Sequence, residues 1–195
     1  MDVQKLKKDK REVTRVLGVD GSSTSMAFCL MTLEDGEWSP KIWGKMDVTG
    51  KDVFERCGDV NSKLYGLMKL LRPDHVAVES VIYVNNRSVV IQLAKIVGAM
   101  LGVVVATGQS ASEVPPVTWM NYIGNPTRDS DEVKQELKKE FPGKTKSWYK
   151  NELRKRRKQR TMRWVRDTYG LDVDDDDVSD AFGICYYAVN NLEER

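Results

Sequence analysis

The chain has 195 residues, of which 41% are hydrophobic and 31% charged, and its net charge is +2. This is the size of one domain, and the apolar content suffices for a packed core, which argues against a disordered chain. A single histidine and three widely spaced cysteines without a CxxC motif argue against His-rich zinc sites, thiolate metal sites and a disulfide framework, so any catalysis must use carboxylates or lysines.

Residues 1–14 form a basic tail that lacks the apolar stretch of a secretory signal. The remainder, 15–195, contains no linker or internal repeat and is expected to form a single domain. The longest apolar run, 96–106, is shorter than the roughly 20 residues that a membrane crossing needs. We therefore expect a cytoplasmic protein without membrane contact, or one in the host cytoplasm if the source is viral.

Three strands are predicted at the start of the domain. Apolar runs at 15–20 and 26–33 flank the turn-prone segment GSSTS, and a third strand is expected at 41–48 after Gly36 and Pro40. The short connections indicate an antiparallel meander.

Helices and strands then alternate. Helical spacing of apolar residues predicts helices at 53–71 and 87–101, and strands are expected at 74–79 and, in the sequence VVVAT, at 103–107. The order β, β, β, α, β, α, β predicts a mixed five-stranded sheet flanked by helices, an α/β fold.

The last third of the chain is predicted to be mainly helical. The segment SASEVPP is expected to be a loop, and helices are expected at 117–124, 131–141, 146–169 and 177–190. The stretch near 125–157 is polar and basic and reads as an insertion into the domain.

Positive charge is concentrated in this part of the chain. Residues 144–166 carry eleven Lys and Arg against the single acid Glu152, and they are interleaved with aromatic residues that offer stacking faces, namely Trp148, Tyr149 and Trp164. A solvated helix face would explain a shorter run. The length of this one favours nucleic acid as the partner, with Arg154, Arg156, Arg157 and Lys158 as candidate DNA contacts.

Four acids lie at the ends of predicted elements. Asp20 closes the first strand, Glu79 closes the fourth, and Asp177 and Asp180 lie in the first turn of the last helix. Each alone could mark a turn or cap a helix. Together they can converge at one edge of the sheet, where their hard oxygen ligands favour two Mg²⁺ or Mn²⁺ ions, about 4 Å apart, for phosphodiester hydrolysis.

Three segments resemble the RuvC-type Holliday junction resolvases of the ribonuclease H-like superfamily. They are GVDGSSTSMAFCLM, AVESVIYVNNRSVVIQLAKIVGAMLG and DDVSDAFGICYYAV, in this order. The resemblance implies a ribonuclease H-like fold and a homodimeric, Mg²⁺-dependent endodeoxyribonuclease that nicks four-way junctions symmetrically.

Site residues follow from the same resemblance. Asp20, Glu79, Asp177 and Asp180 match the catalytic metal ligands, and Lys158 matches a basic residue that faces the scissile phosphate. Contacts with the junction centre are implied for the segment after Glu79, at Tyr83, Asn85, Asn86 and Arg87.

The chain departs from the family pattern at several positions. The family has Pro-Gly-Ser after the first acid, where this chain has Gly21, Ser22 and Ser23, and the aromatic wedge expected three residues after Glu79 is Ile82. A basic residue expected near Val117 is replaced by Thr118 or Trp119. The insertion before Lys158 suits a viral branch that also acts on other branched DNA.

Two alternative functions remain open. One is a noncatalytic module that binds branched DNA. The other is an actin-like or sugar-kinase-like phosphotransferase, because GVDGSSTS also resembles the first phosphate-binding turn of that superfamily, although no second copy of such a loop is present.

Overall fold

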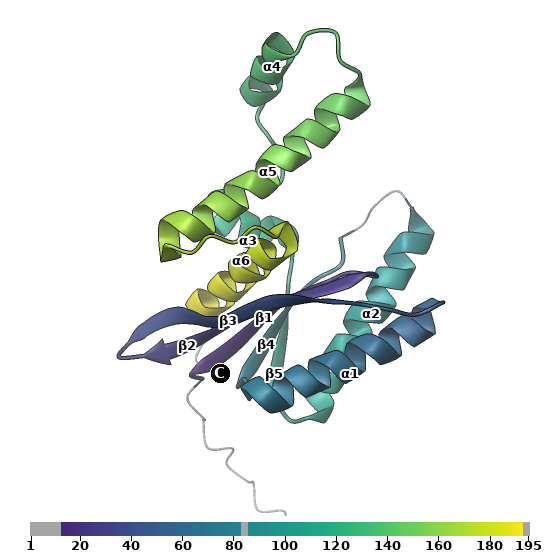
Figure 1. Cartoon of the computed structure of the whole chain (residues 1–195), viewed down its shortest axis with the longest axis vertical. Coiled ribbons are helices and arrows are strands. Elements are labelled where there is room, and N and C mark those ends of the chain that lie inside the picture. Colours follow the sequence, from purple (N-terminus) through teal and green to yellow (C-terminus); the bar gives the residue numbers. More distant parts are fainter. Residues whose placement is uncertain (1–12, 83–85, 193–195) are drawn as a thin grey trace, which may run out of the picture.

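The structure is a computed structural model, and it describes residues 13–82 and 86–192. Figure 1 shows one twisted sheet covered by helices, with two further helices projecting from one end. The elements in chain order are β1 (Arg15–Gly21), β2 (Ser25–Glu34), β3 (Glu37–Asp47), α1 (Val53–Leu71), β4 (His75–Glu79), α2 (Arg87–Ala106), β5 (Ser110–Val114), α3 (Pro116–Tyr122), α4 (Asp131–Glu140), α5 (Lys146–Tyr169) and α6 (Asp176–Asn191).

The sheet has the predicted composition. Its five strands lie in the order β3-β2-β1-β4-β5. The first three strands form an antiparallel meander, whereas β1–β4 and β4–β5 are parallel pairs. The mixed α/β fold expected from the sequence is thereby confirmed.

The fifth strand lies later in the chain than predicted. Residues 103–106 continue α2 instead of forming a strand, and Val104 of that turn is fully buried in the core. The strand is the polar segment SASEV, which was expected to be a loop and which pairs with β4 from His75↔Ser110 to Glu79↔Val114. Packing thus overrides the β propensity of the valines, and an edge strand tolerates polar residues.

The third strand begins earlier than predicted, at Glu37. Pro40 lies inside it, which is possible because β3 is an edge strand, the place in a sheet where proline is tolerated. The register with β2 shifts between Leu30 and Met31, as in a β-bulge. Helices α1, α4, α5 and α6 begin and end within one residue of their predicted ranges.

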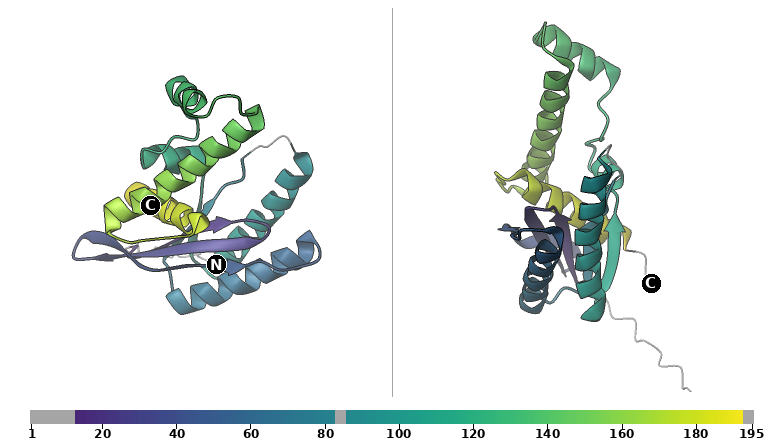
Figure 2. Two further views of the ribbon diagram at one scale, coloured as in Figure 1. Left: turned by 45° about the horizontal axis from the view of Figure 1, so that its top comes forward. Right: turned by 90° about the vertical axis from the view of Figure 1, so that its right-hand side faces the viewer.

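Helices cover both faces of the sheet (Figure 2). On one face, α1 and α2 bury a core that includes Leu17, Val19 and Val78. On the other face, α6 packs over β1 and β2, and its core includes Val16, Ala77 and aromatic residues from α3 and α6. Alternate residues of β1 and β4 therefore point into different cores, as strand geometry requires.

Helix α2 is unusually apolar. By length and composition alone this 20-residue helix could cross a membrane, since an 18-residue stretch of it has a mean hydropathy of 2.3, and 22% of that stretch is buried. One such helix is weak evidence for a span. Within the fold it packs against α1, β4 and β5, which leaves an exposed apolar side.

The predicted insertion forms a helical projection, here called the arm and comprising residues 131–157 (Figures 1 and 2). A buried polar joint connects it to the domain. The side-chain amide of Asn125 donates to the Thr161 hydroxyl at 2.9 Å, and the buried Asp129 accepts hydrogen bonds from Arg157 and Arg160. Because these buried groups satisfy one another, the base of the arm is held in one orientation.

Candidate active site

The two strand-end acids lie on neighbouring strands. In the parallel pair β1–β4, Val19 is opposite Val78, so Asp20 and Glu79 follow as the next residues on adjacent strands. Both valines point into the core under α1 and α2. Since successive side chains alternate between faces, Asp20 and Glu79 share the opposite face, which α6 covers.

The two helical acids lie at the beginning of α6. The Asp175 carboxylate caps this helix by accepting the backbone N–H groups of Asp177, at 2.9 Å, and Val178, at 3.1 Å. Asp177 and Asp180 are three residues apart, a spacing that places side chains on the same side of a helix. The cap thus fixes where the acid pair begins.

A glycine in β1 lets α6 approach the sheet closely. A Cβ atom built on Gly18 would lie 2.6 Å from the carbonyl oxygen of Ala181 and 2.6 Å from Cβ of Cys185. Only hydrogen fits in this space. The contact lies two residues from Asp20 and one residue from Asp180, so it sets the separation of the strand acids and the helix acids.

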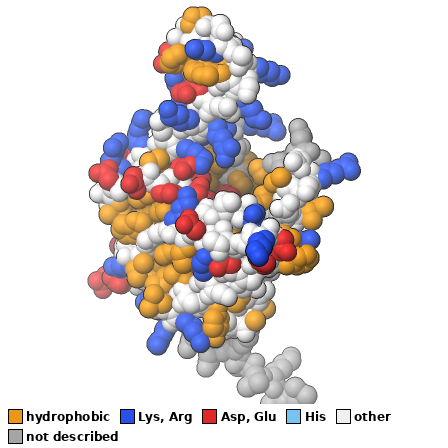
Figure 3. All heavy atoms as spheres, turned by 45° about the vertical axis from the view of Figure 1, so that its right-hand side comes forward, with side chains coloured by type: hydrophobic (Ala, Val, Ile, Leu, Met, Phe, Trp, Pro, Cys, Tyr) orange, Lys and Arg blue, Asp and Glu red, His pale blue; other side chains and the backbone are white. Residues whose placement is uncertain are grey.

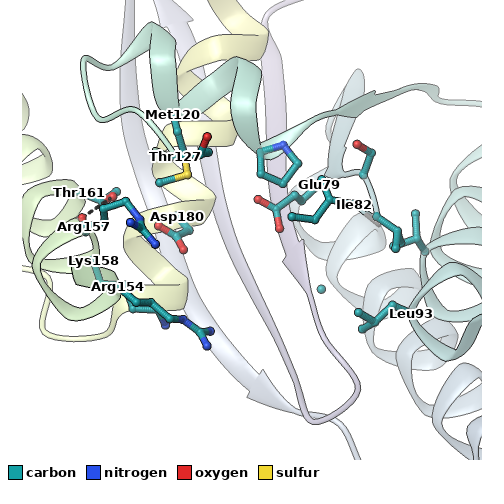
Figure 4. A pocket seen from close by; sticks show the side chains of 15 residues that line it. Glu79, Ile82, Leu93, Met120, Thr127, Arg154, Arg157, Lys158, Thr161 and Asp180 are labelled. Carbon is teal, nitrogen blue, oxygen red and sulfur yellow. Dashed lines mark hydrogen bonds between the residues drawn. The ribbon is translucent and has the colours of Figure 1, made fainter. Parts of the chain in front are cut away.

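A cavity of about 470 Å³ opens beside these acids. Figure 4 shows the carboxylates of Glu79 and Asp180 facing each other across it, with Lys158 and Arg154 of α5 on the side of Asp180. The cavity is large enough to admit a phosphodiester group and its attached sugars. Its walls carry both signs of charge.

Two lysines hold the beginning of α6. Lys45 of β3 forms ion pairs with Asp177 at 2.6 Å and with Asp175 at 3.0 Å. Lys158 of α5 pairs with Asp176 and lies 3.6 Å from a carboxylate oxygen of Asp177. These contacts join three distant segments of the chain at one point.

The acids strongly influence one another. Burial and the charges of Glu79, Asp180 and Asp177 raise the pKa of Asp20 well above its ordinary value. Burial, together with the nearby carboxylates, raises the pKa of Asp180 to about 7 and that of Glu79 to about 7, the latter despite a hydrogen bond from Trp119 that lowers it. The pKa of Asp177 is lowered, because Lys45 and Lys158 outweigh the effect of burial.

These donors suit a hard divalent cation. The acids offer carboxylate oxygens, which Mg²⁺ and Mn²⁺ prefer. Burial first, and the neighbouring carboxylates second, raise the pKa values of Asp20 and Asp180, so a bound cation would stabilise their charged forms. Asp175, Asp176 and Asp177 present oxygen atoms within 4.8 Å of one another, a set that shares only Asp177 with the predicted ligands. The ligands of a two-ion site are shared between two ions, so the oxygen atoms of the four predicted ligands need not all lie within 4.8 Å of one another.

Neutralising one acid should stabilise the protein in the absence of metal. Because the pKa of Asp180 in the fold, about 7, exceeds that of an unfolded chain, metal-free stability falls as pH rises from about 4 through 7. We expect Asp180→Asn in EDTA at pH 8 to be more stable than the parent, by at most about 4 kcal/mol. Mg²⁺ should raise the melting temperature of the parent more than that of the variant.

Thermal unfolding at pH 5 and pH 8, with and without Mg²⁺, measures both effects. Asp172→Asn is the control, because this acid is exposed and remote from the cavity. A lower stability of Asp180→Asn than of the parent at pH 8 in EDTA would contradict the inferred cost of burying this charge beside other carboxylates.

Comparison with known proteins decides the family. The model of the family described as crossover junction endodeoxyribonuclease RuvC matches residues 16–135, more than half of the chain. The chain belongs to the RuvC family. A curated RuvC relative, from Caldanaerobacter subterraneus subsp. tengcongensis, is 25% identical over 126 residues, which is 64% of this chain and 76% of that protein.

Solved structures agree with the fold of the RuvC family. Thermus thermophilus RuvC in complex with a Holliday junction substrate superposes with a TM-score of 0.62 at 15% identity, covering 90% of this chain and 95% of that one. The fowlpox virus resolvase, solved with Holliday junction DNA, gives a TM-score of 0.54 at 13% identity, with coverage of 92% and 99%. At these identities the likeness concerns the fold.

The structure brings most of the predicted site residues together. The four acids interact with one another, and Lys158 lies beside Asp176 and Asp177. Arg154 and Arg157 line the cavity, whereas Arg156 pairs with Glu140 and Glu152 inside the arm.

The remaining candidates belong to the segment after Glu79. Asn86 caps α2 and Arg87 begins that helix, and both are exposed. Tyr83 and Asn85 lie outside the described residues.

Sequence reasoning missed three side chains at the site. Trp119 of α3 is buried and donates its indole N–H to Glu79 at 2.9 Å, which fixes the orientation of that carboxylate. Lys45 and Ser25 reach Asp177 from β3 and β2. The departure from the family pattern near Val117 is a signal that could have found Trp119, but Lys45 gives no local signal because its partner Asp175 lies 130 residues away.

Proposed function

We propose that this protein is a Mg²⁺-dependent endonuclease that resolves Holliday junctions and acts on other branched DNA. The observation that carries the proposal is the convergence of Asp20, Glu79, Asp177 and Asp180 at a cavity that Glu79 and Asp180 line together with cations of α5. Membership of the RuvC family supports the same activity.

The four acids would hold two Mg²⁺ ions, for which Mn²⁺ can substitute, and the bound metal would supply Lewis acidity and a water of lowered pKa for phosphodiester hydrolysis. The other side chains have supporting roles. Trp119 holds one oxygen of Glu79 in place. Lys158 pairs with carboxylates at the start of α6 in this structure. When DNA enters the cavity, Lys158 would pair with a phosphate oxygen in their place.

The alternatives fit the site less well. A module that only binds DNA gains nothing from clustered carboxylates, because they repel phosphate. A phosphotransferase would use the turn after Asp20 to hold phosphate, yet the Ser22 hydroxyl is turned back onto Ser25, within 3.0 Å of its hydroxyl. Both observations favour hydrolysis.

A homodimer is part of the proposal, and α2 supports it. Its outward side carries apolar and small residues at helical spacing, all of them exposed: Ile91, Ala94, Gly98, Gly102 and Val105. A Cβ atom built on either glycine would meet no atom within 4 Å, so a second helix can approach closely. An exposed apolar helix face of this kind is typical of a subunit contact.

A panel of DNA substrates tests the proposed function. Four-way junctions, flaps, nicked duplexes and linear duplexes of equal length and composition should be incubated with the protein in Mg²⁺, in Mn²⁺ and in EDTA. We expect the junction to be nicked at symmetrical positions in either metal and left intact in EDTA. Equal cleavage of linear duplex would contradict structure selectivity, and cleavage in EDTA would contradict the role of the metal.

A further inference from the structure

The arm carries a row of cations that its own fold does not use. Between Lys146 and Lys158, helix α5 contains a single acid, Glu152, which is engaged with Arg156 at 3.3 Å. Figure 3 shows Lys and Arg side chains gathered on the arm and at its base. These cations have different surroundings, and the difference separates them into two groups.

One group stabilises the arm. Arg156 joins α5 to α4 through Glu140 at 2.8 Å, and Arg157 and Arg160 bind the buried Asp129. Each of these arginines has a carboxylate partner inside the protein. They are therefore compensated, and their main effect is to hold the arm on the domain.

The other group has no such partner. Lys146, Lys150 and Arg154 are exposed, and in residues 13–82 and 86–192 no carboxylate lies within ion-pair distance of any of them. Arg154 is nevertheless close enough to Asp180 for its charge to lower the pKa of that acid. Like charges four residues apart on a helix destabilise it slightly. A row of them without acidic partners is expected where an external anion supplies the compensation.

The spacing of this row leads to the catalytic cavity. Lys146, Lys150, Arg154 and Lys158 follow at intervals of four residues, so each lies only about 40° around the helix from the one before. The row is about 18 Å long, the length of roughly five base pairs. Its lower end, Arg154 and Lys158, lines the cavity that contains Glu79 and Asp180.

The tip of the arm is ordered by aromatic contacts. Trp148 packs against Phe141 and Tyr149, with ring centroids 5.2 and 5.4 Å apart, and the Tyr149 hydroxyl donates to the carbonyl of Phe141 at 2.5 Å. The upper end of the row is therefore held by packing at the tip and by the polar joint at the base.

We propose that Lys146, Lys150 and Arg154 bind the phosphates of one duplex arm of the DNA substrate and guide it from the tip of the arm to the cavity. This rests on the proposed function, because it deepens the identity of the substrate bound at that site. The occupant is a DNA duplex, which matches the row in charge and in length.

The test compares two double variants in an Asp20→Asn background, so that binding is measured without cleavage. Lys146→Gln/Lys150→Gln removes two cations of the row. Lys155→Gln/Arg163→Gln removes two exposed cations from other sides of the same helix and is the matched control. Affinity for a four-way junction is measured from 50 to 200 mM salt.

We expect the negative slope of log K against log salt to be shallower by about 1.8 for the row variant than for the parent. The loss of affinity between 50 and 200 mM salt should therefore be roughly tenfold smaller for the row variant. The control should leave the slope unchanged. With one junction arm cut to three base pairs, the difference between parent and row variant should shrink. Equal slopes for the two double variants, or a difference that ignores arm length, would overturn the proposal.

Cleavage separates this inference from the proposed function. With Asp20 restored, the row variant should need more enzyme than the parent to reach half-maximal nicking of the junction, whereas the Lys155→Gln/Arg163→Gln control should need the same amount as the parent. If the slopes of parent and row variant differ as expected but the parent does not cut junctions, the DNA-binding role of the row is supported and the nuclease proposal is wrong. If the parent cuts junctions but the row variant has the same slope as the parent, the nuclease proposal is supported and the DNA-binding role of the row is wrong.

Discussion

Replacing Asp20 by Asn should abolish junction cleavage and leave junction binding nearly unchanged. The substitution keeps the side-chain volume and removes one charge from the centre of the carboxylate cluster, where Asp20 interacts with Glu79, Asp177 and Asp180. Losing one metal ligand costs several kcal/mol of transition-state stabilisation, so we expect the single-turnover rate to fall roughly 10³-fold or more. Affinity should persist, because cations bind the DNA backbone.

Rates on a labelled four-way junction and affinity in EDTA measure the two effects separately. Asp172→Asn is again the control, since it removes the same charge from an exposed position. A variant at Asp20 that loses binding and cleavage in equal proportion would argue against a catalytic role for this carboxylate.

Gly18→Ala should impair both stability and cleavage, although Gly18 has no functional group. The added methyl group would lie 2.6 Å from the carbonyl oxygen of Ala181 and 2.7 Å from the backbone nitrogen of Cys185, so α6 must move away from β1. Overpacking of this kind costs about 1–3 kcal/mol. Moving Asp177 and Asp180 by about 1 Å relative to Asp20 should lower the cleavage rate roughly 10²-fold.

Gly44→Ala is the matched control for this prediction. Gly44 also lies in a strand, but a Cβ there would contact only the Phe28 ring, at 3.4 Å. Denaturant unfolding and single-turnover cleavage should both be near parental for this variant. Parental cleavage by Gly18→Ala would show that the spacing of α6 and β1 does not govern the site.

The positions of the candidate catalytic acids could be predicted from the sequence because each follows a local rule. Asp20 is the next-to-last residue of an apolar strand and Glu79 the last residue of another, and the acid pair lies at the beginning of α6, whose buried residues include Phe182. Parallel pairing of β1 and β4 then brings the strand acids together without further information.

Other features could not be read because tertiary contacts decide them. The valines at the end of α2 favour a strand locally, but Val104 gains more by packing into the core beneath the sheet. Lys45 is one of the exposed residues of an edge strand, and only the fold brings it to Asp177. The pairing of Asp129 with Arg157 and Arg160 also depends on a joint between separate segments.

Helix α5 is continuous from the tip of the arm to its C-cap at Gly170. Lys150 and Lys158 are thus eight residues, or about 12 Å, apart along one continuous helix. The helix fixes both the distance and the direction of Lys150 from the cavity, since each inserted residue would turn the part of α5 nearer the tip by about 100°. Inserting one residue after Asn151 would swing Lys150 out of line with the cavity, whereas inserting seven, close to two full turns, would return it to nearly the same side farther out.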